Sequence, residues 1–520
     1  MRSKVDELED ILPEEPAKKQ YFLEKGYSDL KAVIKDSFAL NSKDAKNQFK
    51  KGHSDSDHTV VKISNWFMRI CASLAIRLFG MALTLAISAV HCLIVFVIML
   101  FVRLALAISK LIDFIYVHFG RISVICDNCK TKSVLPGYKC PICGQIHYRL
   151  RPNDYGIFTH KCLCGQKLPA LFLCSTKNKD TGEAIKRKKL EALCSNPDCS
   201  KVVYCEESRP LCIPIAGSTS VGKTSYLTAV SHELIEARLK PAGCEIVQYS
   251  PEKENGFLEL MSNYSSGEVE KTHESNEIDA PSAFSVSYFV THKTLRPKRL
   301  VHMFDIAGET FLNNSEHEGQ KHYRYSDGVI LIIDPLSIPE VSSQFEDQLN
   351  EVDLKGTGKD DPDKALSSLI GKMRLQAGLN EGQKIDVPLA VVINKIDEPG
   401  ICEFFTDNAK KRFADSEHKQ ADCVAENLLC KAFFTDNCMG NFVNLIEVNF
   451  KTVRYFACSA IGHTRGDGAY SPQHVLKPIE WITSLTDPKL NKLIVDKQKS
   501  SSSEANAEGE SKKESEANNE

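Results

Sequence analysis

The stretch that decides the fold is Gly217-Ser-Thr-Ser-Val-Gly-Lys-Thr224 (GSTSVGKT). An apolar run from Leu211 to Ala216 precedes it, and a run typical of a helix, SYLTAVSHELIEARL, follows it. A glycine-bounded loop between a strand and a helix can turn its backbone N–H groups toward phosphate oxygens, and the helix N-terminus adds partial positive charge. The order of strand, loop and helix therefore predicts an α/β domain with a phosphate-binding loop.

Two side chains of this loop have predicted roles in the chemistry. We expect Lys223 to reach the β and γ phosphates of a nucleotide, and Thr224 to offer its hydroxyl to Mg²⁺. The residues expected to contact the nucleotide here are Gly217, Ser218, Thr219, Ser220, Val221, Gly222, Lys223, Thr224 and Ser225.

A second motif, Asp305-Ile-Ala-Gly308, follows a run typical of a strand, Arg299–Phe304. A carboxylate at a strand end can hold the Mg²⁺ shell, and a glycine three residues later lets its amide approach the γ phosphate. We therefore expect Asp305 and Gly308 to face the phosphates from a neighbouring strand.

Three further apolar runs are typical of strands buried on both faces. Residues 328–333 lead to Asp334, residues 390–393 lead to Asn394-Lys395-Ile-Asp397, and residues 454–457 lead to Cys458-Ser459-Ala460. Together with the first two strands they predict a mostly parallel central sheet whose carboxyl ends carry the site.

The ordered set GxxxxGKT, DxxG, NKxD and SA resembles the P-loop GTPases of the translation-factor and Ras-like class, over roughly residues 210–485. The resemblance implies that Asp397 accepts hydrogen bonds from the guanine N1 and exocyclic amine. It also implies that Asn394 and Lys395 support the loop and cover the base, and that the Ser459-Ala460 backbone meets the guanine oxygen. Adenine lacks that donor edge and would leave Asp397 unpaired, so GTP and GDP are expected in preference to ATP.

The chain departs from this family at two positions. The switch threonine has no unique match; Thr272 is our choice as a Mg²⁺ ligand, over Thr291 and Thr294, because it precedes the strand-like run 284–290. Glu309 stands where many relatives carry a glutamine that orients the attacking water. A glutamate can accept a hydrogen bond from water but cannot donate one to phosphate, so slow hydrolysis is expected, helped by a protein partner or by dimerisation. The expected catalytic set is Lys223, Gly308, Glu309 and Thr272.

A second feature of the chain is an apolar segment from Leu78 to Val102, LFGMALTLAISAVHCLIVFVIMLFV, which contains no charged residue. At about 1.5 Å per residue it is long enough to cross a hydrocarbon core of roughly 30 Å, so it predicts a single transmembrane helix. A hairpin over 66–119 turning near His91 is the alternative, although it would bury Arg77 and Arg103 at about 2.5–3.5 kcal/mol each. The nucleotide domain and the cysteine-rich segment described below are expected in the cytosol. If the source is bacterial, the membrane is expected to be the inner membrane.

Cysteine is the third feature, because ten of the 19 cysteines lie between Cys126 and Cys205. In a chain of this size such a density indicates metal binding rather than disulfides. Cys126, Cys129, Cys140 and Cys143 form CxxC-x10-CxxC, the spacing of a four-thiolate zinc ribbon. A second ribbon from Cys162, Cys164, Cys194 and Cys199 is predicted, with His160 and Cys174 as spare ligands.

The chain has 520 residues and a formal net charge of -3, which argues against a globally cationic nucleic-acid binder. The basic run Lys186–Lys189 keeps nucleic-acid binding open as a lesser alternative. The order of segments also loosely resembles the bacterial double-GTPase group associated with zinc ribbons. We expect a membrane-anchored GTPase switch, or a GTP-binding scaffold with negligible turnover. The predicted segments are 1–64 (polar, partly disordered), 65–119 (membrane), 120–206 (ribbons), 207–496 (GTPase domain) and 497–520 (disordered tail).

Overall fold

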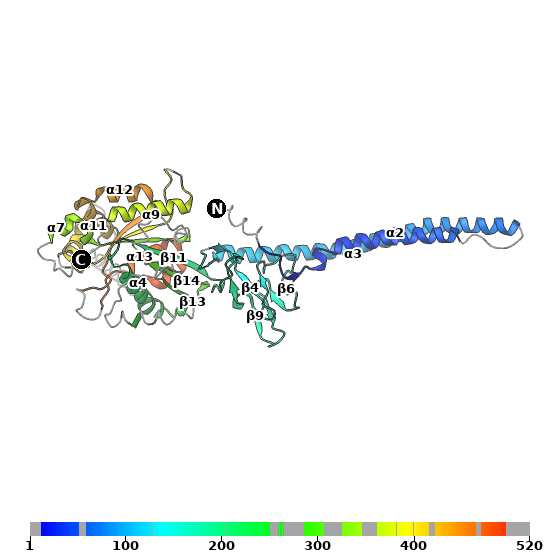
Figure 1. Cartoon of the computed structure of the whole chain (residues 1–520), viewed down its shortest axis with the longest axis horizontal. Coiled ribbons are helices and arrows are strands. Elements are labelled where there is room, and N and C mark those ends of the chain that lie inside the picture. The colour runs from blue at the N-terminus through cyan, green and yellow to red at the C-terminus, as the bar shows by residue number, and fades with distance from the viewer. Residues whose placement is uncertain are drawn as a thin grey trace, which may run out of the picture. The chain divides into compact units, whose positions relative to one another are not determined.

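The computed structural model divides the chain into two compact units (Figure 1). The first comprises Met1–Arg121 and Ser133–Glu206, and the second comprises Ile122–Lys132 and Glu207–Glu520. The structure describes residues 12–50, 59–126, 128–129, 131–204, 206–249, 258, 261–262, 264, 285–305, 325–345, 361–380, 382–398, 400–414, 422–463 and 470–495.

Seven strands of the described chain form one sheet in the second unit, in the order β12-β13-β14-β11-β15-β16-β17. Neighbours from β14 to β17 pair in parallel, whereas β13 pairs antiparallel with both β12 and β14. The strand bounds are β11 (Arg209–Ala216), β12 (Glu245–Gln248), β13 (Ser285–His292), β14 (Leu295–Asp305), β15 (Val329–Ile333), β16 (Leu389–Ile393) and β17 (Val453–Ala457).

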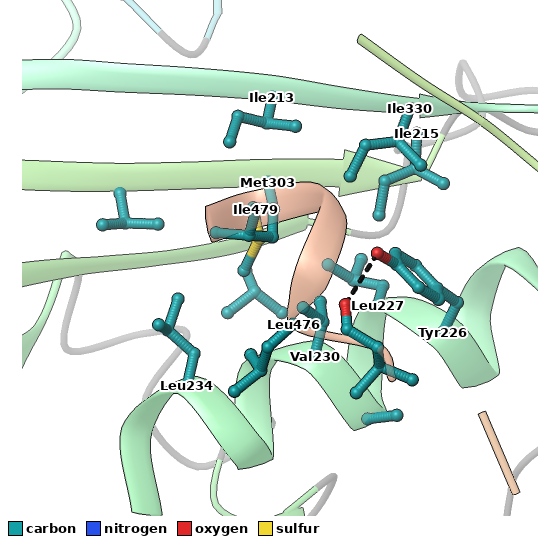
Figure 2. Close-up of a cluster of buried hydrophobic side chains, with 14 of the residues drawn as sticks. Ile213, Ile215, Tyr226, Leu227, Val230, Leu234, Met303, Ile330, Leu476 and Ile479 are labelled. Atoms are coloured by element: carbon teal, nitrogen blue, oxygen red, sulfur yellow. Dashed lines mark hydrogen bonds between the residues drawn. The ribbon is translucent and has the colours of Figure 1, made fainter. Parts of the chain in front are cut away.

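Each face of this sheet is covered by helices, because successive strand residues point to opposite sides. In β15, Ile330 and Ile332 belong to one buried cluster, and Val329 and Leu331 belong to the other. The first cluster includes side chains of α4, η3, α13 and α14, and the second includes side chains of α7, α9, α11 and α12. Figure 2 shows the first cluster, where the hydroxyl of Tyr226 donates to the Val475 carbonyl at 2.9 Å.

Helices of the second unit lie between β15 and β16 and between β16 and β17. The one over 362–377 has local signals at each end: the Asp361 side chain accepts from the N–H of Asp363, and Gly378 follows with φ 62°. The bounds are α4 (Lys223–His232), η3 (Glu233–Leu239, π-helical), η5 (Pro335–Ser337), α7 (Pro339–Gln344), α9 (Pro362–Ala377), η6 (Cys402–Phe405), α10 (Asp407–Ala414), α11 (Asp422–Asp436), α12 (Gly440–Asn449), α13 (Lys477–Thr486) and α14 (Pro488–Ile494).

The first unit contains a helix of 62 residues, α3 (Thr59–Gly120), which is long and apolar enough to cross a membrane. It passes His91 without interruption, so the hairpin alternative of the sequence is not formed. A second helix, α2 (Gly26–Lys50), runs antiparallel to α3 (Figure 1). The hydroxyl of Ser73 donates to the Ala45 carbonyl at 2.9 Å where the two helices touch.

The last turns of α3 contact residues from η2 and from the loop after β5 in the same unit. Asp113 of α3 is 1% exposed, accepts from Arg187 at 3.0 Å and pairs with Arg151 at 2.7 Å. A buried charge is stable only when it is paired in this way, so these residues anchor the helix. The short elements are β1 (Ala17–Lys18), η1 (Tyr21–Leu23), β4 (Gly137–Lys139), β5 (Ile146–His147), β6 (Thr159–Cys162), β7 (Lys167–Pro169), β8 (Ser175–Lys177), β9 (Ala184–Lys186), η2 (Arg187–Lys189) and β10 (Ala192–Leu193), and β2 (Val124–Ile125) pairs with β3 (Lys132–Ser133) in the segment after α3.

Candidate functional site

The phosphate-binding loop lies between β11 and α4, as the sequence predicts. Its backbone requires glycine at two positions. A Cβ at Gly217 would lie 2.6 Å from the Ile332 carbonyl oxygen, and Gly222 has φ 85° and would place a Cβ 2.6 Å from the Asn394 amide nitrogen. Ser220 also has a positive φ, 63°. The loop is therefore held close to β15 and to the NKxD segment, where no side chain could replace either glycine.

Lys223 and Thr224 are the first two residues of α4, and their side chains bond to different partners. The Lys223 ammonium is 7% exposed and donates to the Ser218 carbonyl at 2.6 Å, across the loop. The Thr224 hydroxyl donates to Oδ2 of Asp305 at 2.7 Å, at the end of β14. The carboxyl ends of β11 and β14 therefore bring together the residues predicted to bind phosphate and Mg²⁺.

Asp305 has the properties of a cation ligand. It is 4% exposed, and its Oδ1 is buried with no hydrogen-bond partner among the described residues. Burial raises the pKa of Asp305, against the opposing effects of Lys223 and Thr224. An unpartnered buried carboxylate oxygen is costly unless a cation pairs with it, and a carboxylate beside a hydroxyl is a donor set that Mg²⁺ accepts.

Asn394 connects three segments of the predicted base site. Its side chain is 1% exposed, and its amide donates to the Val221 carbonyl of the phosphate loop at 3.1 Å. Its amide oxygen accepts the N–H of Ala460 at 3.2 Å, from the turn after β17. This residue therefore supports the loop, as the resemblance implied, and does so by tying β11, β16 and β17 together.

Lys395 forms an ion pair with Asp334, a contact that was not predicted from the sequence. Its ammonium lies 2.6 Å from Oδ2 of Asp334 and 3.2 Å from the Ser220 carbonyl, and its backbone has φ 58°. Asp334 is fully buried at the end of β15. The signal available in the sequence was an acidic residue that ends an apolar strand next to the NKxD strand in the sheet.

The remaining base-site residues also lie at strand ends. Asp397 is partly exposed in the turn after β16, and Ser459 is buried, with its hydroxyl accepting the N–H of Gly462 at 2.7 Å. Thr272, Gly308 and Glu309 lie outside the described residues.

The cysteine pairing expected from the sequence is wrong. Cys140 and Cys143 lie with Cys162 and Cys164, rather than with Cys126 and Cys129, and the four sulfur atoms lie within 4.8 Å of one another. Cys194 and Cys199 lie outside this group. The reason is that the turns of two hairpins, β4–β5 and β6–β7, face each other, so knuckles that are not the nearest along the chain come together.

This group has the form of a four-thiolate zinc site. The sulfur of Cys140 lies 3.7 Å from that of Cys164, and the sulfur of Cys143 lies 3.5 Å from that of Cys162. Gly144 and Gly165 follow the two knuckles with φ 73° and 89°, the conformation in which each chain turns around the sulfurs. Burial raises the pKa of Cys140, so metal binding at this group would displace a proton.

The basic run Lys186–Lys189 does not present one continuous basic face. Arg187 is 1% exposed, and its guanidinium donates to Asp113 and to the carbonyls of Leu150 and Ala170. Its charge is used inside the unit, which removes the central member of the surface that the nucleic-acid alternative required.

The chain was compared with known protein families, curated proteins and solved structures. Residues 211–428 match the model of a family described as Double-GTPase 2. No curated protein matches the chain. Two solved structures are similar at 14% identity: the GTPase-like domain of S. cerevisiae Ski7 bound to GTP (TM-score 0.25, covering 55% of this chain and 51% of that one), and Sup35 complexed with GMPPNP (TM-score 0.20, covering 48% and 37%). The chain therefore spans about half or less of these relatives. Over residues 211–428 the chain therefore resembles the double-GTPase proteins.

Proposed function

We propose that this protein is a membrane-anchored GTPase that hydrolyses GTP slowly and acts as a nucleotide-dependent switch. The observation that carries the proposal is the assembly of the phosphate loop, Asp305 and the NKxD segment at one edge of the sheet. Asn394 bonds to both the phosphate loop and the turn after β17, so the base and phosphate sites are built as one unit.

Lys223 and Mg²⁺ would neutralise charge on the phosphates during transfer to water. Thr224 and Asp305 would hold the Mg²⁺, with Thr272 completing the switch when GTP is bound. Gly308 would direct its amide to the γ phosphate, and Glu309 would accept a hydrogen bond from the attacking water. Because Glu309 cannot donate a hydrogen bond to the phosphate, turnover is expected to be slow without an activating partner.

In this proposal the first unit places the protein at a membrane. The apolar length of α3 would anchor the chain in a membrane, and Asp113 in its last turns pairs with Arg187 and Arg151 of the same unit. The four-thiolate group would hold zinc as a structural ion, because four thiolates leave no position for a reacting water. Zinc then stabilises the unit that holds the helix.

The proposal is tested by titrating the full chain in detergent with GTP, GDP and ATP in Mg²⁺, while heat and phosphate release are followed together. GTP-selective binding with slow phosphate release is expected. Lys223→Ala should abolish tight binding. The control Lys240→Ala removes an exposed ammonium just after η3, which continues from α4, and should not abolish it. Equal binding of ATP would overturn the guanine assignment.

A GTP-binding scaffold with negligible turnover is the second candidate, since the nucleotide itself can order loops that recruit a partner. The absence of a glutamine after DxxG favours it. The two candidates differ in turnover: phosphate release that is unaffected by Lys223→Ala or Thr224→Ala would support the scaffold.

A further inference from the structure

Three metal-binding side chains meet in the interior of the first unit, apart from the cysteines. Glu15 precedes β1, His147 ends β5 and His160 lies in β6. Glu15 is 6% exposed and both histidines are fully buried. One carboxylate oxygen and one nitrogen from each ring lie within 4.8 Å of one another.

His160 is oriented as a metal ligand. Its Nε2 lies 2.9 Å from the Arg151 carbonyl, which can only accept, so this nitrogen carries the hydrogen. Its Nδ1 is buried, has no hydrogen-bond partner among the described residues, and lies 3.7 Å from Oε1 of Glu15. Metal-bound histidines usually donate their other N–H to a carbonyl or carboxylate in this way, which leaves the free nitrogen aimed at the ion.

The carboxylate of Glu15 is shared between the two rings. Its Oε1 lies 2.8 Å from Nδ1 of His147, and its Oε2 accepts the N–H of Arg149 at 3.0 Å. Burial alone would raise the pKa of Glu15, but the nearby His147 and His160 and the N–H of Arg149 outweigh it and lower the pKa to about 2. Nε2 of His147 is a second buried nitrogen that finds no hydrogen-bond partner in the described part of the chain.

We propose that Glu15, His147 and His160 bind a divalent metal ion of the zinc class. Two imidazoles and one carboxylate are a donor set that Zn²⁺ uses. Tetrahedral bonds of about 2.0–2.2 Å would place neighbouring ligand atoms about 3.3 Å apart, and the separations of 2.8 and 3.7 Å lie on either side of that value. Without an ion, the lone pair on Nδ1 of His160 faces a carboxylate oxygen in a buried site, an arrangement that costs free energy.

The ion would join segments that are distant in the chain. Glu15 and His147 are 132 positions apart, and strand β1, which follows Glu15, pairs with β6 through Ala17 and Cys162. A metal bond at Glu15 would hold the start of the described chain, just before α2, on the ribbon strands. Because the ligands are closed off from solvent, the site is structural rather than a place for reaction.

The experiment measures zinc per chain in the full-length protein, purified in detergent, by inductively coupled plasma mass spectrometry. The double variant His147→Gln/His160→Gln should lose about one zinc per chain, and Glu14→Gln, which changes the exposed neighbour of Glu15, should lose none. Unchanged zinc in the double variant overturns the proposal.

Zinc X-ray absorption on the unaltered protein supplies a test that does not depend on how a variant folds. Nitrogen and oxygen neighbours are expected beside sulfur, and a coordination sphere of sulfur alone overturns the proposal. In Cys143→Ser/Cys164→Ser the nitrogen and oxygen share should rise, because a thiolate site is removed. Neither measurement depends on nucleotide binding.

Discussion

The carboxylate of Asp334 and the ammonium of Lys395 form an ion pair, with Oδ2 and Nζ 2.6 Å apart. Asp334 is fully buried at the end of β15, whereas the Lys395 side chain is 22% exposed. The other oxygen of Asp334 accepts the N–H of Leu336 at 3.0 Å, so the carboxylate cannot turn away. The lysine of the NKxD segment is thereby held before any nucleotide arrives, which lowers the ordering cost of binding.

Replacing this charge should weaken nucleotide binding. We expect Asp334→Asn to reduce GDP affinity about tenfold, or about 1.4 kcal/mol, because Lys395 loses its ion pair while the cap at Leu336 is retained. Fluorescent GDP binding measures the effect. Asp361→Asn is a matched control, since Asp361 likewise caps a helix start with its side chain. Equal affinities in the two variants would contradict the positioning role.

The choice of base should follow Asp397. We expect Asp397→Asn to weaken GTP binding by about 100-fold, because a charged acceptor of the guanine donor edge is lost. The same variant should favour xanthosine triphosphate, whose C2 oxygen can accept from the new amide. Competition titrations report both affinities, and the exposed Asp436→Asn is the control. An unchanged preference would place base recognition elsewhere.

A buried ion pair should dominate the stability of the second unit. Asp487 pairs with Arg299, each 1% exposed, and accepts the N–H of Leu490 at 3.3 Å. We expect Asp487→Asn to lower the free energy of unfolding by about 3–5 kcal/mol, because Arg299 is left buried without a counter-charge. Urea unfolding is followed by Trp481 emission in a Trp66→Phe background, which leaves one tryptophan.

The control for this measurement is Asp386→Asn, which breaks an ion pair with Lys451 whose side chains are 84% and 54% exposed. Exposed pairs contribute about 0–1 kcal/mol, so this variant should unfold almost as the unaltered chain does. A loss at Asp487 no larger than the loss at Asp386 would show that the buried pair is not a main source of stability.

The same ion pair predicts how stability depends on pH. Burial would raise the pKa of Asp487, but Arg299 and Arg209 outweigh it and hold the pKa below its usual value. A lowered folded pKa adds stability above the unfolded pKa of about 3.9 and loses it as pH falls through the folded value. The difference between the unaltered chain and Asp487→Asn should therefore be constant from pH 6 to 8 and shrink below about pH 4. A difference that grows in acid would contradict the assignment.

Zinc should depend on the cysteines that the structure groups together. Cys164→Ser should lower zinc content by about one ion per chain and make the first unit more sensitive to protease. Cys174→Ser is the matched control, because Cys174 lies ten positions away and outside the group. A similar loss in both variants would contradict the grouping of Cys140, Cys143, Cys162 and Cys164.

The nucleotide site could be predicted from the sequence because its parts are local. Gly217 and Gly222 are needed by the conformation of one loop, and the strand before it and the helix after it are visible in the same few residues. Asp305 and Asn394 follow apolar runs, and parallel strands bring such ends to one edge of a sheet. The helix over Leu78–Val102 could also be predicted, because the apolar composition of that segment alone indicates it.

The cysteine grouping is not local, and the grouping expected from the spacing of the cysteines is wrong. Cys140 and Cys162 share a group because two hairpins pack face to face, and spacing along the chain does not record that contact. Arg187 is a second example: its place in the basic run Lys186–Lys189 predicts a surface residue, but in the structure it is buried against Asp113.

The sequence by itself determined the kinds of chemistry in this protein: a phosphate loop, a guanine-reading segment, thiolate knuckles and an apolar helix. Only the tertiary structure decided which of these side chains are partners. Asp334 and Lys395 are 61 positions apart, and Glu15 and His147 are 132 apart. Local sequence sets backbone conformation through propensity and glycine, but ion pairs and metal ligands are selected by packing between distant segments, where burial makes an unpaired charge costly.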